Sequence, residues 1–325
     1  MNVSGAALRG FGHAVAALTS RPRLSILIFH RVLAKPDSLL PGEPDAALFE
    51  ARMRLVKSAF KVMPLTDAAR HLRERTLPAN AACITFDDGY ADNASVALPI
   101  LQRVGIPATF FVATGFLDGG RMWNDTVIEA VRMVEGPRLD VTALGLGLWD
   151  CATDAERVAA IAGLLDDLKY RPQAERTQKV AELAAHAGVG NRSELMMTRD
   201  QVRGLQAAGM TVGGHTVTHP ILTTLDAGQA RREIDDGKRE LEAIVGAPIP
   251  LFAYPNGKPG CDYDKTHVAL ARELGFDAAV STGWGTSDDR SDPFQLPRFT
   301  PWDLAMNRFG LRLAANLVRR SADVV

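Results

Sequence analysis

Apolar and polar positions divide the chain into two alternating kinds of segment. Short runs of apolar and β-branched residues predict strands, and the longer stretches between them carry apolar residues at helical spacing. The predicted strands span residues 24–29, 81–86, 107–114, 210–215, 251–255 and 277–282. The predicted helices span about residues 49–60, 92–104, 198–208, 226–245 and 264–274. Because the strands are apolar on both faces, we expect an α/β fold with a helix-covered parallel sheet, either a barrel or a doubly wound sheet.

This alternation stops between residues 118 and 197, where the chain is rich in Ala and Leu, mostly helical in pattern and without a convincing strand. The sequence WNDT at 123–126 reads as a helix start. No internal repeat, low-complexity tract or Ser/Gly linker separates this stretch from the rest. We therefore predict a single domain over residues 1–325 with a helical insertion at 118–197.

The C-terminal stretch, from about Trp302 to Arg320, is amphipathic. Its apolar residues are Leu304, Phe309, Leu311, Leu313 and Leu317, and they lie among several arginines. We expect a helix packed on the core. The alternative is a helix that lies on a membrane surface.

Composition excludes several classes of protein. The 325 residues include 37 Lys and Arg against 38 Asp and Glu, so no net field favours nucleic acid, and no nucleic-acid partner is expected. No run approaches the roughly 18 apolar residues of a membrane span. The three cysteines are far apart and form no C-x-x-C motif, which is typical of a reducing compartment. We predict a cytoplasmic protein with no integral membrane segment, and peripheral membrane contact stays open.

Two motifs carry candidate chemistry. In the sequence ITFDDG, at 84–89, an apolar strand runs directly into Asp87 and Asp88. Carboxylates at the carboxyl end of a strand lie where α/β enzymes place their sites, although DDG is also an ordinary turn. The second motif is HTVTHP, at 215–220. Its β-branched centre and Pro220 disfavour a helix and place His215 and His219 on a loop after a strand.

The residue types in these motifs fit a catalytic metal site. Thr216 stands where the helical zinc-protease motif carries its glutamate, so a base must come from elsewhere. Two neutral imidazoles and one carboxylate make a three-ligand site that leaves a position open for water. The second carboxylate of the DDG motif is then free to accept the proton of that water.

In this order, the motifs TFDDG, HTVTH and FAYPNG resemble those of the polysaccharide deacetylases, the NodB-homology or carbohydrate esterase 4 family, over about residues 23–300 outside the insertion. The resemblance implies a distorted (β/α)₇ TIM-like barrel that removes acetyl groups from N-acetylated sugars. It implies that Asp87 is the general base and that Asp88, His215 and His219 hold a divalent metal. The metal implied is zinc, or else cobalt or another divalent ion.

The third motif supplies candidates for binding the substrate: Tyr254, Pro255 and Asn256. In the family a backbone N–H of this motif binds the tetrahedral oxyanion, and it maps here to Asn256. Trp284, after the strand at 277–282, is our preferred aromatic residue for the acetyl or sugar pocket. Tyr90, Trp123 and Trp302 are the other aromatic candidates, and each is otherwise a core residue.

The sequence departs from the family pattern at two places. Many relatives have an arginine in the third motif that holds the base, but Ala253 stands there. We hypothesise that Arg298, in LPRF, supplies the guanidinium that holds the base. The alternative is that Arg298 is a surface arginine. Many relatives also use a late histidine as general acid, whereas His267 lies in a helical pattern and is expected to be solvated. We hypothesise that His30 takes this role or holds the substrate; the alternative is a structural hydrogen bond.

The FHRV ending of the first strand resembles the branch of the family that acts on exopolysaccharides. We therefore predict a metal-dependent hydrolase of an N-acetylated saccharide in exopolysaccharide or surface-glycan synthesis. One alternative is a deformylase or another amide hydrolase on the same metal site. The other is a noncatalytic carbohydrate-binding protein.

Overall fold

Seven strands form the main sheet of this computed structural model, which describes residues 4–19, 21–190, 193–301, 303–319 and 324–325. They are β1 (Leu24–Phe29), β2 (Lys61–Val62), β3 (Ala81–Phe86), β4 (Thr109–Val112), β7 (Thr211–Gly214), β8 (Leu251–Ala253) and β9 (Ala278–Val280). Their order is β1-β3-β4-β7-β8-β9, with β2 beside β3, and every pair is parallel. The carboxyl ends of the strands therefore share one end of the sheet.

A short segment at residues 296–299 joins the two edges of this sheet. Leu296 bridges Val280 of β9, and Phe299 bridges Leu27 of β1, both in parallel. The Phe299 N–H donates to the Ile26 carbonyl at 2.7 Å, and the Ile28 N–H donates to the Phe299 carbonyl at 3.1 Å. The sheet thus curls into a distorted barrel, which confirms the barrel prediction over the doubly wound alternative.

Side chains alternate between two apolar clusters along each strand. Ala81 and Cys83 of β3 face one cluster, which also holds Phe111, Ala253 and Leu296. Ala82, Ile84 and Phe86 face the other, which holds the apolar faces of the covering helices. Because successive side chains of a strand point to opposite faces, the first cluster is the barrel interior and the second is the layer between barrel and helices.

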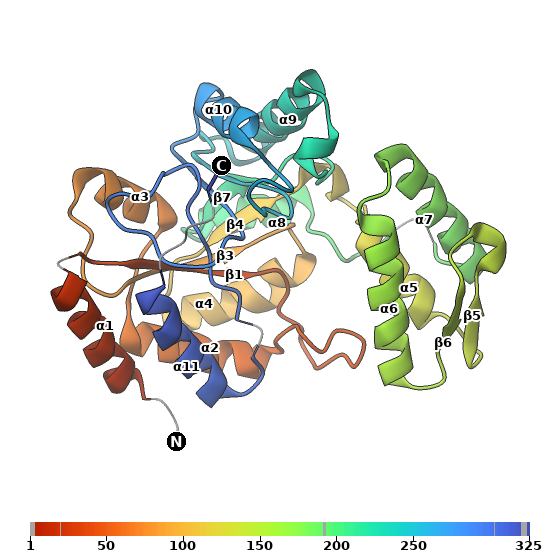
Figure 1. Cartoon of the computed structure of the whole chain (residues 1–325), viewed down its shortest axis with the longest axis horizontal. Coiled ribbons are helices and arrows are strands. Elements are labelled where there is room, and N and C mark those ends of the chain that lie inside the picture. The colour runs from red at the N-terminus through yellow and green to blue at the C-terminus, as the bar shows by residue number, and fades with distance from the viewer. Residues whose placement is uncertain (1–3, 20, 191–192, 302, 320–323) are drawn as a thin grey trace. The chain divides into compact units, whose positions relative to one another are not determined.

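The helices of the barrel unit surround this sheet (Figure 1). They are α1 (Gly5–Thr19), α2 (Ala46–Ala59), α3 (Leu65–Glu74), α4 (Leu98–Val104), α8 (Arg199–Ala207), α9 (Ala227–Val245), α10 (Lys265–Glu273) and α11 (Met306–Val318). A π-helical turn (η1, Asn93–Ala97) precedes α4, and 3-10 turns span Thr114–Phe116 (η2) and Leu222–Thr224 (η4). Side-chain caps fix several starts: Asp226, for example, accepts from the Gln229 N–H at 2.8 Å to begin α9.

A second compact unit contains residues 35–41 and 118–196. It comprises α5 (Trp123–Arg132), α6 (Asp154–Lys169), α7 (Gln173–Ala187), a 3-10 turn (η3, Thr142–Leu144) and an antiparallel pair, β5 (Arg138–Asp140) and β6 (Leu148–Asp150). It has an apolar core of its own, which includes Leu39, Leu164 and Leu183. The predicted helix start at 123–126 is confirmed. The expectation that this stretch lacks strands is wrong, because β5 and β6 pair across a short connection.

The C-terminal stretch forms α11 and packs on the core, as expected. Phe309, Leu313 and Leu317 are buried, whereas Leu304 and Leu311 are exposed. Trp302 and Arg320, which bound the predicted stretch, lie outside the described residues. Within the described ranges, none of the helices combines the length and hydrophobicity that a membrane crossing requires.

Candidate active site

Strand alternation delivers three polar side chains to the carboxyl end of the barrel interior. Asp87 continues the inward series of Ala81 and Cys83, one residue after β3 ends. His215 follows β7 directly, two residues after Gly213, whose missing side chain leaves room for the Phe111 ring. Arg298 lies two residues after the inward-facing Leu296. All three side chains are almost completely buried.

Two further side chains reach the same place from strained turns. Asp88 and His219 adopt positive φ angles of 76° and 52°, and Thr216, between the histidines, has a φ of 65°. Such a conformation is costly for residues other than glycine and is concentrated at functional sites. Asn256, in the third motif, has a φ of 57° as well. Strained turns thus occur in all three motif loops.

Asp88, His215 and His219 form a compact donor cluster. Asp88 Oδ1 lies 3.4 Å from His215 Nε2 and 3.4 Å from His219 Nε2. One ligand atom from each of the three residues lies within 4.8 Å of the others. Asp88 Oδ1 is buried and has no hydrogen-bond partner in the described part of the chain. A buried carboxylate oxygen without a partner is costly, so the donor set fits a bound cation.

The hydrogen bonds of His215 prepare it as a ligand. Its Nδ1 lies 2.7 Å from the Ala253 carbonyl, an acceptor only, so Nδ1 carries the proton and Nε2 is free to coordinate. Ala253 therefore contributes its backbone at the position where many relatives have an arginine. Asp88 and His219 complete the set.

Burial and neighbouring charges shift the protonation of this cluster. Burial would raise the pKa of Asp88, but the adjacent His215 and His219 outweigh it and hold the pKa well below its usual value. Burial lowers the pKa of His219 to about 4. An ionised carboxylate and a neutral imidazole are the forms that bind a divalent cation. Burial would lower the pKa of His215, but the carboxylates of Asp87 and Asp88 outweigh it and raise that pKa.

Asp87 forms a buried bidentate pair with Arg298. Arg298 Nη1 and Nη2 each donate to one carboxylate oxygen at 2.7 Å, and Nε donates to the Ser281 carbonyl at 2.9 Å. Burial opposes ionisation of Asp87, but the guanidinium lowers the pKa of the carboxyl below its usual value. Asp87 Oδ2 lies 3.9 Å from His215 Nε2, beside the donor cluster. The structure thus brings together the two residues that the sequence hypothesis paired.

His30 lies at the same end of the barrel, one residue after β1. Its side chain is half-buried, and its carbonyl accepts from Asn93 Nδ2 at 2.8 Å. Burial is the largest influence on the pKa of Asp87, Asp88 and His219, and a smaller electrostatic interaction with His30 lowers the pKa of each. His30 therefore lies near the cluster, and its role in the reaction stays a prediction.

The third motif forms a tight loop after β8. The Gly257 N–H donates to the Pro255 carbonyl at 2.6 Å, and Thr282 Oγ1 donates to the Asn256 carbonyl at 2.7 Å. Pro255 is buried and Asn256 is half-buried. Among the hydrogen bonds of the described residues, none uses the Asn256 N–H. That N–H is available to a ligand.

The structure corrects one predicted substrate contact, that of Tyr254, and leaves that of Trp284 a prediction. Tyr254 is fully buried in the helix layer, where its hydroxyl donates to the Phe294 carbonyl at 3.0 Å and its ring stacks on Tyr263 at 3.9 Å. Strand alternation explains this, because Ala253 points inward and Tyr254 therefore points outward. The Trp284 ring lies 4.8 Å from the Arg312 guanidinium and 5.3 Å from that of Arg319, and thus packs on the α11 region.

The other aromatic candidates and His267 also have structural partners. Arg31 lies over the Tyr90 ring at 4.8 Å, and Arg176 lies over the Trp123 ring at 5.0 Å. The expectation that His267 is solvated is wrong: it is 5% exposed, and its Nδ1 accepts from the Asp264 N–H at 3.0 Å in the cap of α10. Trp302 is not among the described residues.

Sequence reasoning missed Glu233 of α9, whose carboxylate reaches the loop between the two histidines. It accepts from the Val217 N–H at 3.0 Å, from the Thr218 N–H at 2.8 Å and from the Thr218 hydroxyl at 2.7 Å. No motif links a helical glutamate to a histidine loop fourteen residues upstream, so the sequence contained no signal for this contact.

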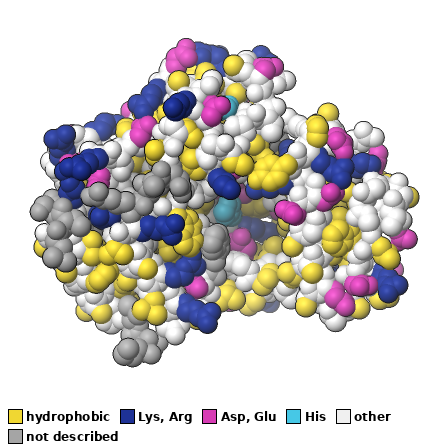
Figure 2. Space-filling model, in the orientation of Figure 1, with side chains coloured by type: hydrophobic (Ala, Val, Ile, Leu, Met, Phe, Trp, Pro, Cys, Tyr) yellow, Lys and Arg dark blue, Asp and Glu magenta, His cyan; other side chains and the backbone are white. Residues whose placement is uncertain are grey.

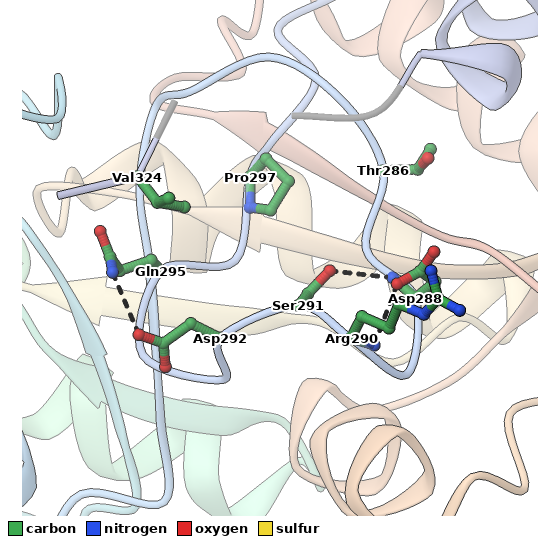
Figure 3. A pocket seen from close by; sticks show the side chains of 8 residues that line it. All are labelled: Thr286, Asp288, Arg290, Ser291, Asp292, Gln295, Pro297 and Val324. Carbon is green, nitrogen blue, oxygen red and sulfur yellow. Dashed lines mark hydrogen bonds between the residues drawn. The ribbon is translucent and has the colours of Figure 1, made fainter. Parts of the chain in front are cut away.

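A pocket of about 310 Å³ lies elsewhere, on the loop between β9 and the barrel-closing segment (Figure 3). Ser287 of this loop pairs with Leu24, the first residue of β1, which places it toward the amino ends of the strands. The polar groups that line the pocket bond to one another: Gln295 Nε2 donates to Asp292 at 3.0 Å, and the Arg290 N–H donates to Asp288 at 3.0 Å. The pocket is therefore separate from the donor cluster.

Comparison with known proteins agrees with this fold. The chain is 20% identical over 283 residues to the Bacillus subtilis (strain 168) protein described as "Putative polysaccharide deacetylase YxkH", covering 86% of this chain and 72% of that protein. The fold is similar to the Streptococcus pyogenes deacetylase PplD in complex with acetate, with a TM-score of 0.60, 18% identity, and coverage of 92% and 100% of the two chains. It is also similar to IcaB from Ammonifex degensii, with a TM-score of 0.56, 19% identity, and coverage of 92% and 98%.

The sequence profile of one family spans more than half of the chain. It matches residues 74–139 and 170–279, a range that contains the TFDDG, HTVTH and FAYPNG motifs. The two solved structures are similar to this chain in fold. On this match, the chain belongs to the polysaccharide deacetylase family.

Proposed function

We propose that this polysaccharide deacetylase is a metal-dependent N-deacetylase that hydrolyses the acetamide of an N-acetylated saccharide. The buried cluster of Asp88, His215 and His219 beside the Asp87–Arg298 pair is the observation that carries the proposal. A deacetylase needs an activated water and a base at one acetamide carbonyl, and this cluster supplies groups suited to both.

The donor set supports a divalent cation, and we propose zinc. Two imidazole nitrogens and one carboxylate oxygen are typical ligands of catalytic zinc, which keeps a coordination position open. Such a cation would polarise the acetyl carbonyl and lower the pKa of a water to about 7. The unpartnered Asp88 Oδ1 supports this assignment.

Asp87 is proposed as the general base. Its carboxylate is ionised and lies beside the cluster, and Arg298 holds both of its oxygens. Because the guanidinium fixes the orientation of the carboxylate, Asp87 can accept the proton of the attacking water without reorganising. Arg298 acts through Asp87 and is therefore a positioning residue.

Asn256 and His30 are proposed to complete the reaction. The free Asn256 N–H would donate to the developing oxyanion, the role that a backbone amide performs in hydrolases of acyl groups. His30, half-buried beside the cluster, would protonate the leaving amine so that the C–N bond breaks to give acetate and a free amino sugar.

Substrate profiling tests the proposal. We expect purified enzyme with zinc to release acetate from N-acetylated oligosaccharides and no formate from the N-formylated counterparts. Formate release alone would favour the deformylase alternative. A protein that binds zinc and saccharide but releases neither acid would instead be the noncatalytic carbohydrate-binding alternative.

A role in exopolysaccharide or surface-glycan synthesis is part of the proposal, supported by the FHRV sequence at the end of β1. Deletion of the encoding gene is expected to raise the acetyl content of the amino sugars in the surface polysaccharide. An unchanged acetyl content would contradict this role.

We further propose peripheral contact with an anionic membrane through α1 and α11. Neither helix contains an acidic residue, and the two are in contact. Phe11, Leu311 and Val318 are exposed, and hydrophobic and basic side chains mix over this region (Figure 2). Binding to vesicles that contain anionic lipid, lost on Leu311→Asp, is expected. Equal binding to neutral vesicles would contradict the charge argument.

A cytoplasmic location is proposed as well. Cys83, Cys151 and Cys261 lie far apart in the sequence and form no C-x-x-C motif, which fits a reducing compartment. Cell fractionation is expected to place the protein in the cytoplasmic and inner-membrane fractions, and recovery from the medium would contradict this.

A further inference from the structure

The loop that carries both histidines, residues 215–219, has no regular secondary structure of its own, yet it must hold two imidazoles at a fixed separation. Its backbone groups are satisfied from two sides. From η2, the Thr114 N–H donates to the Thr216 carbonyl at 3.2 Å, and the Gly115 N–H donates to the Val217 carbonyl at 2.9 Å. Within the loop, the His219 N–H donates to Thr216 Oγ1 at 3.0 Å.

On the side of the loop that faces α9, one side chain, Glu233, accepts the hydrogen bonds of the loop. Glu233 accepts from two N–H groups of the loop, those of Val217 and Thr218, on a single carboxylate oxygen at 3.0 and 2.8 Å. Its second oxygen accepts from the Thr218 hydroxyl at 2.7 Å. Three charge-assisted hydrogen bonds thus fix the two residues that precede His219.

The packing of α9 against the loop makes these bonds possible. Gly237 lies one helical turn after Glu233, and a Cβ atom at Gly237 would be 2.9 Å from the carbonyl carbon of Thr216. The helix can therefore approach the loop backbone closely. The loop itself is strained, with positive φ at Thr216 and His219, so it needs external contacts to keep its conformation.

We propose that Glu233 is a positioning residue for the metal ligands, which fixes the separation of His215 and His219 and thereby sets the affinity of the site for a divalent cation. This inference rests on the proposed function, because it takes both histidines as ligands. Glu233 contacts neither histidine side chain in the described hydrogen bonds, so it acts through the loop backbone. Loss of such a supporting partner typically weakens metal binding by about 10–100-fold.

The test is the zinc dissociation constant of chelator-stripped protein, measured by competition with a chromophoric chelator. We expect Glu233→Ala to weaken zinc binding by about 10–100-fold. Glu233→Gln keeps an acceptor oxygen and is expected to fall between Glu233→Ala and the wild type. Asp236→Ala removes an exposed carboxylate from the same helix and is expected to bind zinc as the wild type does.

The variants also separate positioning from a general loss of structure. If Glu233→Ala does not fold, Glu233→Gln and Thr218→Val replace it in the test, because each loses only part of the hydrogen-bond network. Both variants are expected to bind zinc more weakly than the wild type. Without metal, both are expected to unfold at the wild-type temperature. Wild-type affinity in Glu233→Ala, or equal losses in Glu233→Gln and Asp236→Ala, would overturn the positioning role alone. Absence of zinc binding by the wild type would overturn the proposed function as well.

Discussion

At the scale of single residues, the Asp87–Arg298 pair is the most exacting contact of the site. Both groups are buried, and Arg298 Nη1 and Nη2 each donate to a separate carboxylate oxygen at 2.7 Å. A lysine would keep the charge but could not hold both oxygens. The pair therefore restricts Asp87 to one orientation, beside the donor cluster.

Replacing Arg298 is expected to lower turnover. Arg298→Lys should reduce kcat by about 10²-fold, because the base is no longer held in one geometry. Arg298→Ala leaves a buried carboxylate unpaired and should also destabilise the protein by about 3–5 kcal/mol. Acetate-release kinetics and denaturant unfolding measure both effects, with the exposed Arg308→Ala as control. A wild-type kcat in Arg298→Lys would contradict the role of Arg298 in positioning Asp87.

His30→Gln is expected to lower kcat by about 10²- to 10⁴-fold, the usual contribution of a general acid, with zinc content unchanged. His13→Gln, on the exposed face of α1, is the matched control and should leave kcat unaltered. If His30→Gln turned over as fast as the wild type at every pH, the proton donor would lie elsewhere.

Sequence motifs were sufficient to find the donor cluster but not every neighbour of it. Asp88, His215 and His219 could be predicted because two imidazoles and a carboxylate suit a metal site and because the order of the three motifs resembles that of a known family. Tyr254 was wrongly expected at the substrate, although strand alternation alone, with Ala253 facing inward, would have turned it toward the helices. Glu233 could not be predicted, because its contact depends on how α9 packs against a loop.

At the scale of secondary-structure elements, the longest apolar runs were the most predictable. β1 and β3 span the predicted residues 24–29 and 81–86 because both are buried on both faces. β5 and β6 were missed because each strand has only three residues, and the first and last of the three are exposed. The pattern of such short strands is too brief to distinguish them from loop.

The close approach of α9 to the loop that carries both histidines, residues 215–219, gives a prediction at this scale. Gly237→Ala would place a methyl group 2.9 Å from the Thr216 backbone, so the helix or the loop must shift. We expect a loss of about 1–3 kcal/mol in the free energy of unfolding and weaker zinc binding. Denaturant unfolding and zinc competition measure the two effects.

Gly204→Ala is the control for this substitution. A Cβ atom at Gly204 meets nothing within 4 Å, and the residue lies in the exposed part of α8. This variant should gain about 0.5–1 kcal/mol from helix propensity. Equal effects at the two glycines would contradict the close packing of α9 on the loop.

At the scale of the whole molecule, the barrel is closed by a segment that the apolar pattern did not identify as a strand. Residues 296–299 make only isolated bridges, to β9 and to β1, and yet they carry Arg298 into the interior. The second unit also takes residues 35–41 from a distant part of the chain, which the predicted boundary at 118–197 did not include. A single domain with one insertion stays a prediction.

The separate core of the second unit leads to a prediction about the whole chain. Leu164 is fully buried there, and Leu164→Ala should destabilise that unit by about 2–5 kcal/mol. Because the donor cluster belongs entirely to the barrel unit, the zinc dissociation constant should not change. Calorimetric unfolding and zinc competition on the same variant check this, and a parallel loss of zinc affinity would show that the units are coupled.

The central claim is that Asp88, His215 and His219 hold a metal while Asp87 acts as base. The most direct test is zinc content, by elemental analysis, together with acetate release from N-acetylated oligosaccharides, for the wild type and Asp87→Asn. We predict about one equivalent of zinc in both proteins, as a three-ligand site implies, and acetate release that falls by at least about 10²-fold in Asp87→Asn. Loss of zinc from Asp87→Asn, or acetate release at the wild-type rate, would contradict the assignment.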